Sequence, residues 1–258
     1  MAEDTPILPA ATILLVRDQP AFEVLMVRRH HQIDFAAGAL VFPGGKIDPG
    51  DHVAAWADFL FDWAGPADEA RALRIAAIRE AYEETGILLA RSPEGAPFAG
   101  DDRAAAARPE VTADPRAFLD LVRELDIRLD LAGLAVFARW ITPALMPKRF
   151  DTWFFVAAAP ERQLALCDGF ETVEAEWIEP AEAIRLADLG ERKVIFPTRM
   201  NLKLLAEAAG AEDAMERARA RRLVTVEPRI AERPEGRVLV IPADAGYGDV
   251  FEPISRIA

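Results

Sequence analysis

Three glutamates are grouped in the segment IREAYEETGI, residues 78–87. At the period of an α-helix, Glu80, Glu83 and Glu84 share one stripe, and Arg79 lies beside it. Carboxylates held this close repel one another unless a positive group lies between them. Magnesium prefers oxygen ligands and is usually held by a few carboxylates together with substrate phosphates. The stripe therefore predicts a divalent-cation site that polarises a phosphoryl group and activates water. The alternative is a solvated acidic helix face.

A glycine-rich loop, FPGGKIDPGD at residues 42–51, precedes this helix in the sequence. Gly44 and Gly45 carry no side chain, so their backbone can approach a ligand or a metal closely. A loop of this kind upstream of the carboxylates favours the metal-site interpretation over the solvated helix face.

The loop and the helix together resemble the signature of the Nudix hydrolase family. That signature is a Gly, five residues, a Glu, seven residues, and then Arg-Glu-apolar-any-Glu-Glu-any-Gly-apolar. Gly45 takes the place of the first glycine, and residues 79–87 match every fixed letter of the second block. Asp51 replaces the first glutamate, and 27 residues separate it from Arg79. Family members that resemble peroxisomal coenzyme A diphosphatases carry an insertion at this place.

The resemblance implies an α/β fold, specifically an α/β/α sandwich with a mixed sheet. It also implies that Mg²⁺ or Mn²⁺ is bound by Glu80, Glu83, Glu84 and the carbonyl of Gly45. Glu83, Glu84 and Arg79 would be catalytic, with the planar guanidinium of Arg79 orienting a carboxylate of the motif. The reaction would be attack of metal-activated water on a diphosphate that is linked to another group.

The general base in this family is often a glutamate on a later segment. The stretch DGFETVEAEWIEPAEAI resembles the family's late strand, followed by a helix that begins with proline. Glu174 is our first choice for the catalytic base and Glu171 the second. Solvated loop acids are the alternative interpretation.

Substrate-binding residues are suggested by LMVRRHHQIDFAAGALVFPGG, upstream of the glycine loop. This stretch resembles a motif of coenzyme A-cleaving Nudix enzymes, and it departs from the motif at Asp34, where a second Arg is expected. Arg29, Gly38 and Gly44 are therefore the candidate substrate-binding residues. Arg149 joins them, because it follows a proline-rich loop and could meet an anionic substrate.

Several functions fit this motif. The leading hypothesis is a pyrophosphohydrolase of coenzyme A or acyl-coenzyme A. ADP-ribose, NADH or a nucleotide sugar is the alternative substrate. A non-catalytic ligand sensor is disfavoured, because such domains typically lose motif carboxylates. Isomerase chemistry on a prenyl diphosphate expects a catalytic Cys, and Cys167 lies far from the motif in sequence.

Composition limits the partners. The chain has 43 acidic and 30 basic residues and a net charge of −13, which argues against a nucleic-acid partner. A single cysteine excludes an internal disulfide. The start of the chain does not read as a signal peptide, and no stretch approaches a membrane span. We expect a soluble cytoplasmic protein that acts on a small-molecule diphosphate, and the sequence is compatible with a homodimer.

The elements that position these residues follow from hydrophobic periodicity and turn signals. We expect a hairpin of two strands at 11–18 and 22–29, and the carboxylate helix at 68–85 with Gly86 as its C-cap. Residues 91–114 show weak periodicity and are expected to form a loop. Further helices are expected at 52–64, 117–127, 180–189, 197–209 and 211–222, and further strands at 87–90, 134–142, 152–159, 172–178 and in the tail.

We expect a single domain over residues 1–258. In this interpretation one insertion lies within the motif at about 52–72 and a second at about 91–130. The C-terminal helices and tail occupy about 197–258.

Overall fold

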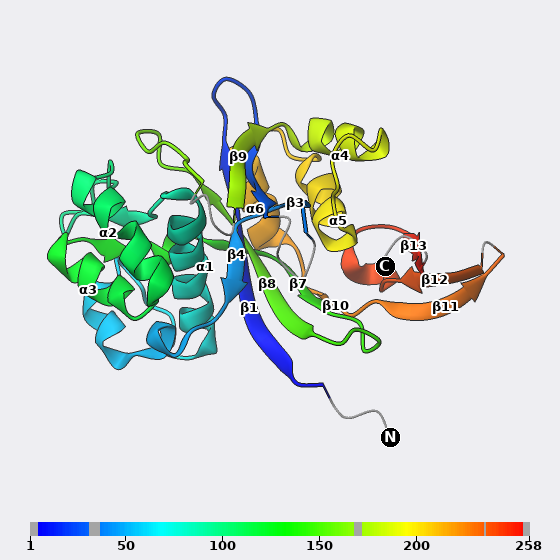
Figure 1. The fold of residues 1–258 in the computed structure, drawn as a ribbon, viewed down its shortest axis with the longest axis horizontal. Helices are drawn as coiled ribbons and strands as arrows, with labels where there is room; N and C mark the ends of the chain where they lie inside the picture. Colours follow the sequence, from blue (N-terminus) through cyan, green and yellow to red (C-terminus); the bar gives the residue numbers. More distant parts are fainter. Residues whose placement is uncertain (1–4, 31–36, 168–171, 235, 255–258) are drawn as a thin grey trace.

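A mixed β-sheet lies at the centre of the molecule. The computed structural model describes residues 5–30, 37–167, 172–234 and 236–254. Among these residues the main sheet has eight strands, and helices cover both of its faces (Figure 1). The strands are β1 (Ile7–Arg17), β2 (Glu23–Arg29), β3 (Leu40–Val41), β4 (Gly44–Lys46), β7 (Ala135–Ile141), β8 (Arg149–Ala158), β9 (Thr172–Ile178) and β10 (Thr225–Val226).

The strand order is β10-β7-β8-β1-β2-β3, with β4 paired to β1 and β9 paired to β2. β1 runs parallel to β8 and antiparallel to β2, so the predicted hairpin of the first two strands is confirmed. The glycine loop becomes strand β4, whose Gly45 lies opposite Ala11 of β1. This pairing places the two glycines against the most central part of the sheet.

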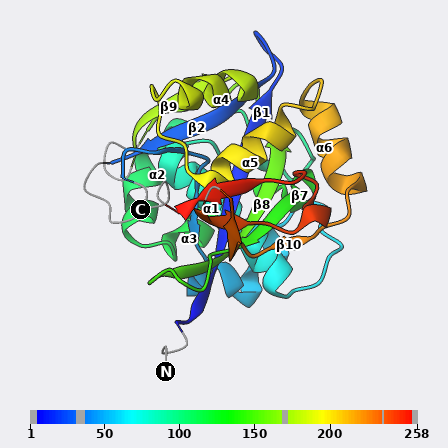
Figure 2. The ribbon, with the colours of Figure 1, turned by 90° about the vertical axis from the view of Figure 1, so that its right-hand side faces the viewer.

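The helices form two layers, which makes the predicted α/β/α arrangement with a mixed sheet correct. α1, α2 and α3 cover one face, and α4, α5 and α6 cover the other (Figures 1 and 2). No helix in the described part of the chain is long and apolar enough to cross a membrane. The helices are α1 (Glu69–Thr85), α2 (Asp102–Ala113), α3 (Ala117–Glu124), α4 (Pro180–Asp188), α5 (Phe196–Leu205) and α6 (Ala211–Ala220), with short 3-10 helices η1 (Pro49–His52), η2 (Ala54–Phe59), η3 (Leu131–Gly133) and η4 (Ala243–Ala245).

The carboxylate helix is confirmed as α1, and local chemistry defines both of its ends. The side chain of Asp68 accepts a hydrogen bond from Ala70 N at 2.9 Å and caps the N-terminus. Gly86 adopts a left-handed conformation with φ of 76°, and its N–H donates to Tyr82 O. Most of the helix between these caps is buried against the sheet and α2.

The α-helix expected at 52–64 is wrong. The segment instead contains the two 3-10 helices η1 and η2, separated at Val53, which has extended ψ. Asp48 and Asp51 form a capping box around η1, and Trp56 Nε1 donates to Gly50 O at 2.9 Å. These contacts fold the chain back too tightly for α-helical hydrogen bonds. Trp56 is buried in the core beneath α1.

The loop expected at 91–114 is also wrong in part, since α2 occupies Asp102–Ala113. Asp101 caps this helix by accepting from Arg103 N at 2.7 Å, and Pro109 lies inside it. Periodicity is weak because the helix buries only small or short apolar side chains, Ala104 and Val111. The expected strand at 87–90 is shorter than predicted, because only β5 (Ala90–Arg91) pairs, with β6 (Arg128–Leu129).

The C-terminal tail forms a separate small sheet beside the main one. Tyr247 connects the tail to the main fold, since its hydroxyl donates to Asn201 Oδ1 at 2.7 Å and accepts from Trp140 Nε1 at 3.2 Å. Trp140 and Tyr247 belong to the core under α4–α6, so Tyr247 lies on the sheet face opposite α1. The sheet contains β11 (Arg229–Arg233), β12 (Gly236–Val240) and β13 (Phe251–Pro253).

Candidate active site

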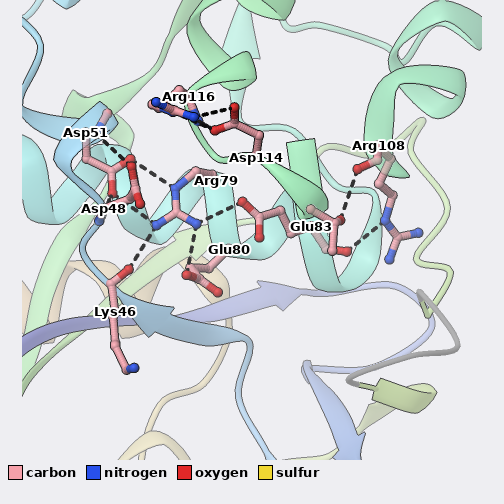
Figure 3. A network of polar contacts seen from close by, with 11 residues as sticks. Lys46, Asp48, Asp51, Arg79, Glu80, Glu83, Arg108, Asp114 and Arg116 are labelled. Atoms are coloured by element: carbon pink, nitrogen blue, oxygen red, sulfur yellow. Dashed lines mark hydrogen bonds and ion pairs between the residues drawn. The ribbon is translucent and has the colours of Figure 1, made fainter. Parts of the chain in front are cut away.

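Arg79 is the centre of the polar network on α1 (Figure 3). Its Nε and Nη2 donate to the two oxygens of Asp51, each at 3.0 Å. Its Nη1 donates to Glu80 at 2.9 Å and Glu83 at 2.8 Å, and its Nη2 also donates to Lys46 O at 2.9 Å. All five N–H groups of the guanidinium are thus in use. The predicted role of Arg79, pairing with a carboxylate of the motif, agrees with this geometry.

The Arg79 side chain is 2% exposed. Burial alone would lower the pKa of its guanidinium. The hydrogen bonds to Asp51 and the charges of Glu80 and Glu83 outweigh burial, so the pKa of Arg79 is raised above its usual range. The guanidinium is therefore a permanent cation that fixes the positions of three carboxylates at once.

Gly44 and Gly45 of β4 lie so close to neighbouring atoms that a side chain would not fit at either position. A Cβ atom on Gly45 would lie 2.5 Å from Glu80 Oε2, and one on Gly44 would lie 2.5 Å from Ala11 O. The N–H of Gly44 donates to Glu84 Oε2 at 3.2 Å. The backbone of the glycine loop therefore meets the carboxylates of Glu80 and Glu84 directly.

Divalent cations fit the donor chemistry of this arrangement. The carboxylate oxygens of Glu80 and Glu84 lie beside the backbone of Gly44 and Gly45, and oxygen donors of this kind suit Mg²⁺ and Mn²⁺. Within the described ranges, no group of three or more His, Cys, Asp or Glu side chains is placed to hold a metal ion. In proteins, Mg²⁺ usually keeps several waters and is held by one or two carboxylates together with substrate phosphates.

The fold changes the protonation of Glu80. Burial raises the pKa of its carboxyl to about 7, with the charge of Arg79 opposing the shift and that of Glu83 adding to it. The folded-state pKa thus lies above the ordinary value of 4.5. Burial of the ionised Glu80 carboxylate therefore destabilises the folded state. This loss of folding stability is absent below pH 4.5, grows as the pH rises from 4.5 to about 7, and is complete above about pH 7.

Glu80→Gln should therefore stabilise the metal-free protein at pH 8 and leave it nearly unchanged at pH 4.5. A shift from 4.5 to about 7 corresponds to at most about 3 kcal/mol in the free energy of unfolding. Thermal unfolding in EDTA at the two pH values measures the difference. An equal effect at both values would show that ionisation of Glu80 is not the cause.

Arg29 and Gly38 lie together near the end of α1. Gly38 N donates to Arg29 O at 3.2 Å. Side chains alternate along β2, so Arg29 belongs to the same sheet face as Leu25, which is in the core beneath α1. Arg29 is also the register partner of Thr172, whose hydroxyl donates to Glu84 O at 3.3 Å. The side chain of Arg29 is thus on the carboxylate side of the sheet, and Gly38 is bonded to the backbone of Arg29.

Glu174 is placed on the opposite side of the sheet. It is the register partner of Arg28, and their side chains form an ion pair at 2.7 Å. Alternation along β2 groups Arg28 with Met26, which belongs to the core under α4–α6. The structure therefore does not bring Glu174 to the carboxylates of α1. Glu171, the second choice for the base, and Asp34 lie outside the described residues.

Arg149 is also separate from the carboxylates. Its Nη2 donates to Glu227 at 2.8 Å. Its register partner on β1 is Ile7, four residues before Ala11, the partner of Gly45. At the rise of an extended strand this is a separation of about 13 Å. Arg149 can therefore contact only a distant part of an extended substrate.

Arg108 is a residue of the site that the sequence did not reveal. Its Nε donates to Glu83 O at 2.9 Å and its Nη1 to Leu166 O at 2.7 Å. A cation that binds the last carbonyls of a helix stabilises the helix end. The signal was hidden, because Arg108 comes from α2, in the segment that was expected to be a loop.

Cys167 is nearer to the motif than its position in sequence suggests. Leu166, which precedes it, donates from its N–H to Thr85 O at 2.8 Å, and Thr85 follows Glu84 on α1. Its distance from the motif along the sequence thus understates how near this segment lies to α1 in space. The pairing of residues 163–166 with the end of α1 brings this segment beside the motif.

The three-layer sandwich, the glycine strand and the carboxylate helix clamped by an arginine define a Nudix hydrolase, and the chain belongs to this family. More narrowly, residues 61–200 match the family model of the NUDT19 Nudix domain. The chain is 31% identical to the acyl-coenzyme A diphosphatase NUDT19 of Homo sapiens, over 90% of this chain and 74% of that protein. It is 28% identical to the same enzyme of Xenopus laevis, over 68% of this chain but only 57% of the frog protein.

A solved structure supports the same assignment. The Nudix hydrolase from Alicyclobacillus acidocaldarius superposes with a TM-score of 0.72 at 31% identity. The match covers 82% of this chain and 96% of the bacterial one.

Proposed function

We propose that this enzyme hydrolyses the diphosphate of coenzyme A or acyl-coenzyme A. The observation that carries the proposal is the likeness to the human acyl-coenzyme A diphosphatase over most of this chain, together with the glutamates of α1 held against the glycine strand. In the reaction, a water oxygen forms a bond to one phosphorus and the bridging P–O bond breaks. A proton is released, and the products are 3′,5′-ADP and 4′-phosphopantetheine or its acyl thioester.

Each residue of the site has a role in this proposal. Glu80, Glu83, Glu84 and the carbonyl of Gly45 would hold Mg²⁺ or Mn²⁺, which when bound polarises the phosphoryl group and lowers the pKa of water. Arg79 keeps the carboxylates of Asp51, Glu80 and Glu83 in place through its five hydrogen bonds.

The substrate is positioned by residues around the carboxylates. Gly44 has no side chain, so a phosphate can approach the glutamates past its backbone. Arg29, whose backbone is bonded to Gly38, can form a bidentate contact with a phosphate. Arg149, at the far end of β8, would contact a distal part of the substrate. Glu83 and Glu84 are better placed than Glu174 to accept the proton of the attacking water, because they lie on the carboxylate side of the sheet.

A substrate panel tests the proposal. The purified protein is incubated with Mg²⁺ or Mn²⁺ and coenzyme A, acetyl-coenzyme A, ADP-ribose, NADH or a nucleotide sugar, and the products are resolved by mass. We expect release of 3′,5′-ADP and a phosphopantetheine, at a rate that exceeds hydrolysis of the other compounds. Preferential cleavage of ADP-ribose, NADH or a nucleotide sugar would retain the Nudix chemistry and overturn the substrate.

Location and assembly remain predictions. We also propose a cytoplasmic location and a homodimer, and the acidic net charge continues to argue against a nucleic-acid partner. Analytical ultracentrifugation of the purified chain measures the oligomeric state directly.

A further inference from the structure

Two leucines are exposed on the segment between β8 and β9. Leu164 is 83% and Leu166 65% exposed, more than any other large apolar side chain in the described part of the chain. Ala165, between them, packs against the core beneath α1. The usual arrangement is thus inverted, with a small residue inward and two large apolar residues in solvent. Burying a leucine contributes about 1.5–3 kcal/mol, which this segment forgoes twice.

Hydrogen bonds hold this segment in place. The side chain of Gln163 accepts from Leu88 N at 2.8 Å and donates to Leu88 O and Phe98 O, both at 2.9 Å. Leu166 N donates to Thr85 O at 2.8 Å. Both ends of the stretch 163–166 are therefore anchored to the layer that carries α1. The leucines are presented outward by a supported backbone.

The same segment is coupled to the carboxylate helix. One guanidinium, that of Arg108, donates both to Glu83 O and to Leu166 O. Thr85, the partner of Leu166, is adjacent to Glu84 in the sequence. The exposed leucines therefore lie beside the end of α1 at which the diphosphate would be bound.

We propose that Leu164 and Leu166 bind the pantetheine arm of the substrate. The inference rests on the proposed function. It places the pantetheine half of the substrate on the surface formed by Leu164 and Leu166. In the pantetheine half, a methylene group joins the phosphate to a carbon that carries two methyl groups. The other half is a nucleotide with an additional phosphate. Apolar side chains beside the diphosphate site suit the first of these and offer the second no polar partner.

A second copy of the chain is a poorer occupant for this surface. Specific protein interfaces bury about 1,200–2,000 Å² in total. Two leucine side chains on one narrow segment supply a small part of such an area. The carbon with two methyl groups in the pantetheine arm, by contrast, is small enough to be covered by two side chains.

The test measures binding of the two product halves separately. We would compare the wild type with a double variant, Leu164→Ser and Leu166→Ser, by calorimetric titration in the presence of Mg²⁺. The ligands are 4′-phosphopantetheine and 3′,5′-ADP. We expect the Kd of 4′-phosphopantetheine to rise about tenfold, the effect of losing roughly one leucine contact, while that of 3′,5′-ADP stays the same.

Leu145→Ser and Leu189→Ser are the matched controls, since these leucines are 48% and 59% exposed elsewhere on the surface. They should leave both dissociation constants unchanged. Equal weakening of the two ligands, or no weakening of either, would overturn the inference. So would a change of oligomeric state in the double variant, because it would assign the leucines to a second copy.

Binding does not require turnover, so this test is independent of the substrate panel. Cleavage of coenzyme A with no effect of the leucines removes only this inference. Selective loss of 4′-phosphopantetheine binding in a protein that does not cleave coenzyme A would retain the binding site and remove the proposed reaction.

Discussion

Glu84→Gln should lower kcat for coenzyme A by about a hundredfold or more. The substitution preserves the size of the side chain, and its amide oxygen can still accept from Gly44 N, as Glu84 Oε2 does at 3.2 Å. It removes the charge that would hold a divalent cation, and metal stabilisation of the transition state is worth several kcal/mol. A loss of about 3 kcal/mol corresponds to roughly a hundredfold in rate. Steady-state kinetics at saturating Mn²⁺ provide the measurement.

Glu174→Gln is the matched control for this experiment. It makes the same chemical change at a glutamate that is paired with Arg28 on the other face of the sheet. We expect its kcat to stay within a few-fold of the wild type. A large loss in Glu174→Gln would restore Glu174 as the general base, and wild-type activity in Glu84→Gln would remove the proposed metal site.

Arg79→Met should destabilise the fold by about 3–5 kcal/mol at pH 7. Removing one member of a buried ion pair leaves its partner without compensation, and this is the typical cost. Here the partners are Asp51, whose side chain is 2% exposed, and Glu83, at 11%. Methionine fills a similar volume, so the loss reports mainly on charge and hydrogen bonding. Urea unfolding followed by circular dichroism gives the difference in the free energy of unfolding.

Arg139→Met offers a comparison at a more exposed pair. Arg139 donates through two nitrogens to both oxygens of Asp151, at 2.9 and 2.6 Å, with side-chain exposures of 32% and 20%. We expect a loss of about 1 kcal/mol, typical of pairs that water can reach. If the two variants were equally destabilised, burial of the network around Arg79 would not be the source of its strength.

The sequence predicted which residues of the motif lie together better than it predicted the form of the segments around them. The role of each motif residue follows from its type. A glycine allows close approach of the backbone, a glutamate supplies a negative charge, and an arginine supplies planar hydrogen-bond donors. The caps at Asp68 and Gly86 are local in the same sense, so α1 was placed to within one residue. By contrast, the α-helix at 52–64 was predicted from the spacing of apolar residues. Hydrogen bonds of Asp51 and Trp56 instead fold this segment into 3-10 helices.

The position of Glu174 illustrates what a single sequence cannot specify. Its sheet face depends on the register of β9 against β2, which shifts between Arg28 and Arg29. Such an irregularity moves side chains from one face to the other. The contacts of Arg108 and Leu166 with α1 could not be predicted for the same reason, because they are long-range. Arg108 lies 25 residues from its partner Glu83, and Leu166 lies 81 residues from its partner Thr85.

The pairing of Arg79 with Asp51 has a consequence for how this motif can change during evolution. The two residues enclose 27 residues where the family signature has seven, yet their side chains meet in two hydrogen bonds. The entropy of closing a flexible loop grows only with the logarithm of its length, so the added stretch costs about 1 kcal/mol. A single well-formed buried contact can offset that amount. The motif therefore tolerates changes of length between Asp51 and Arg79. What it must keep is the contact between these two side chains, not their separation along the sequence.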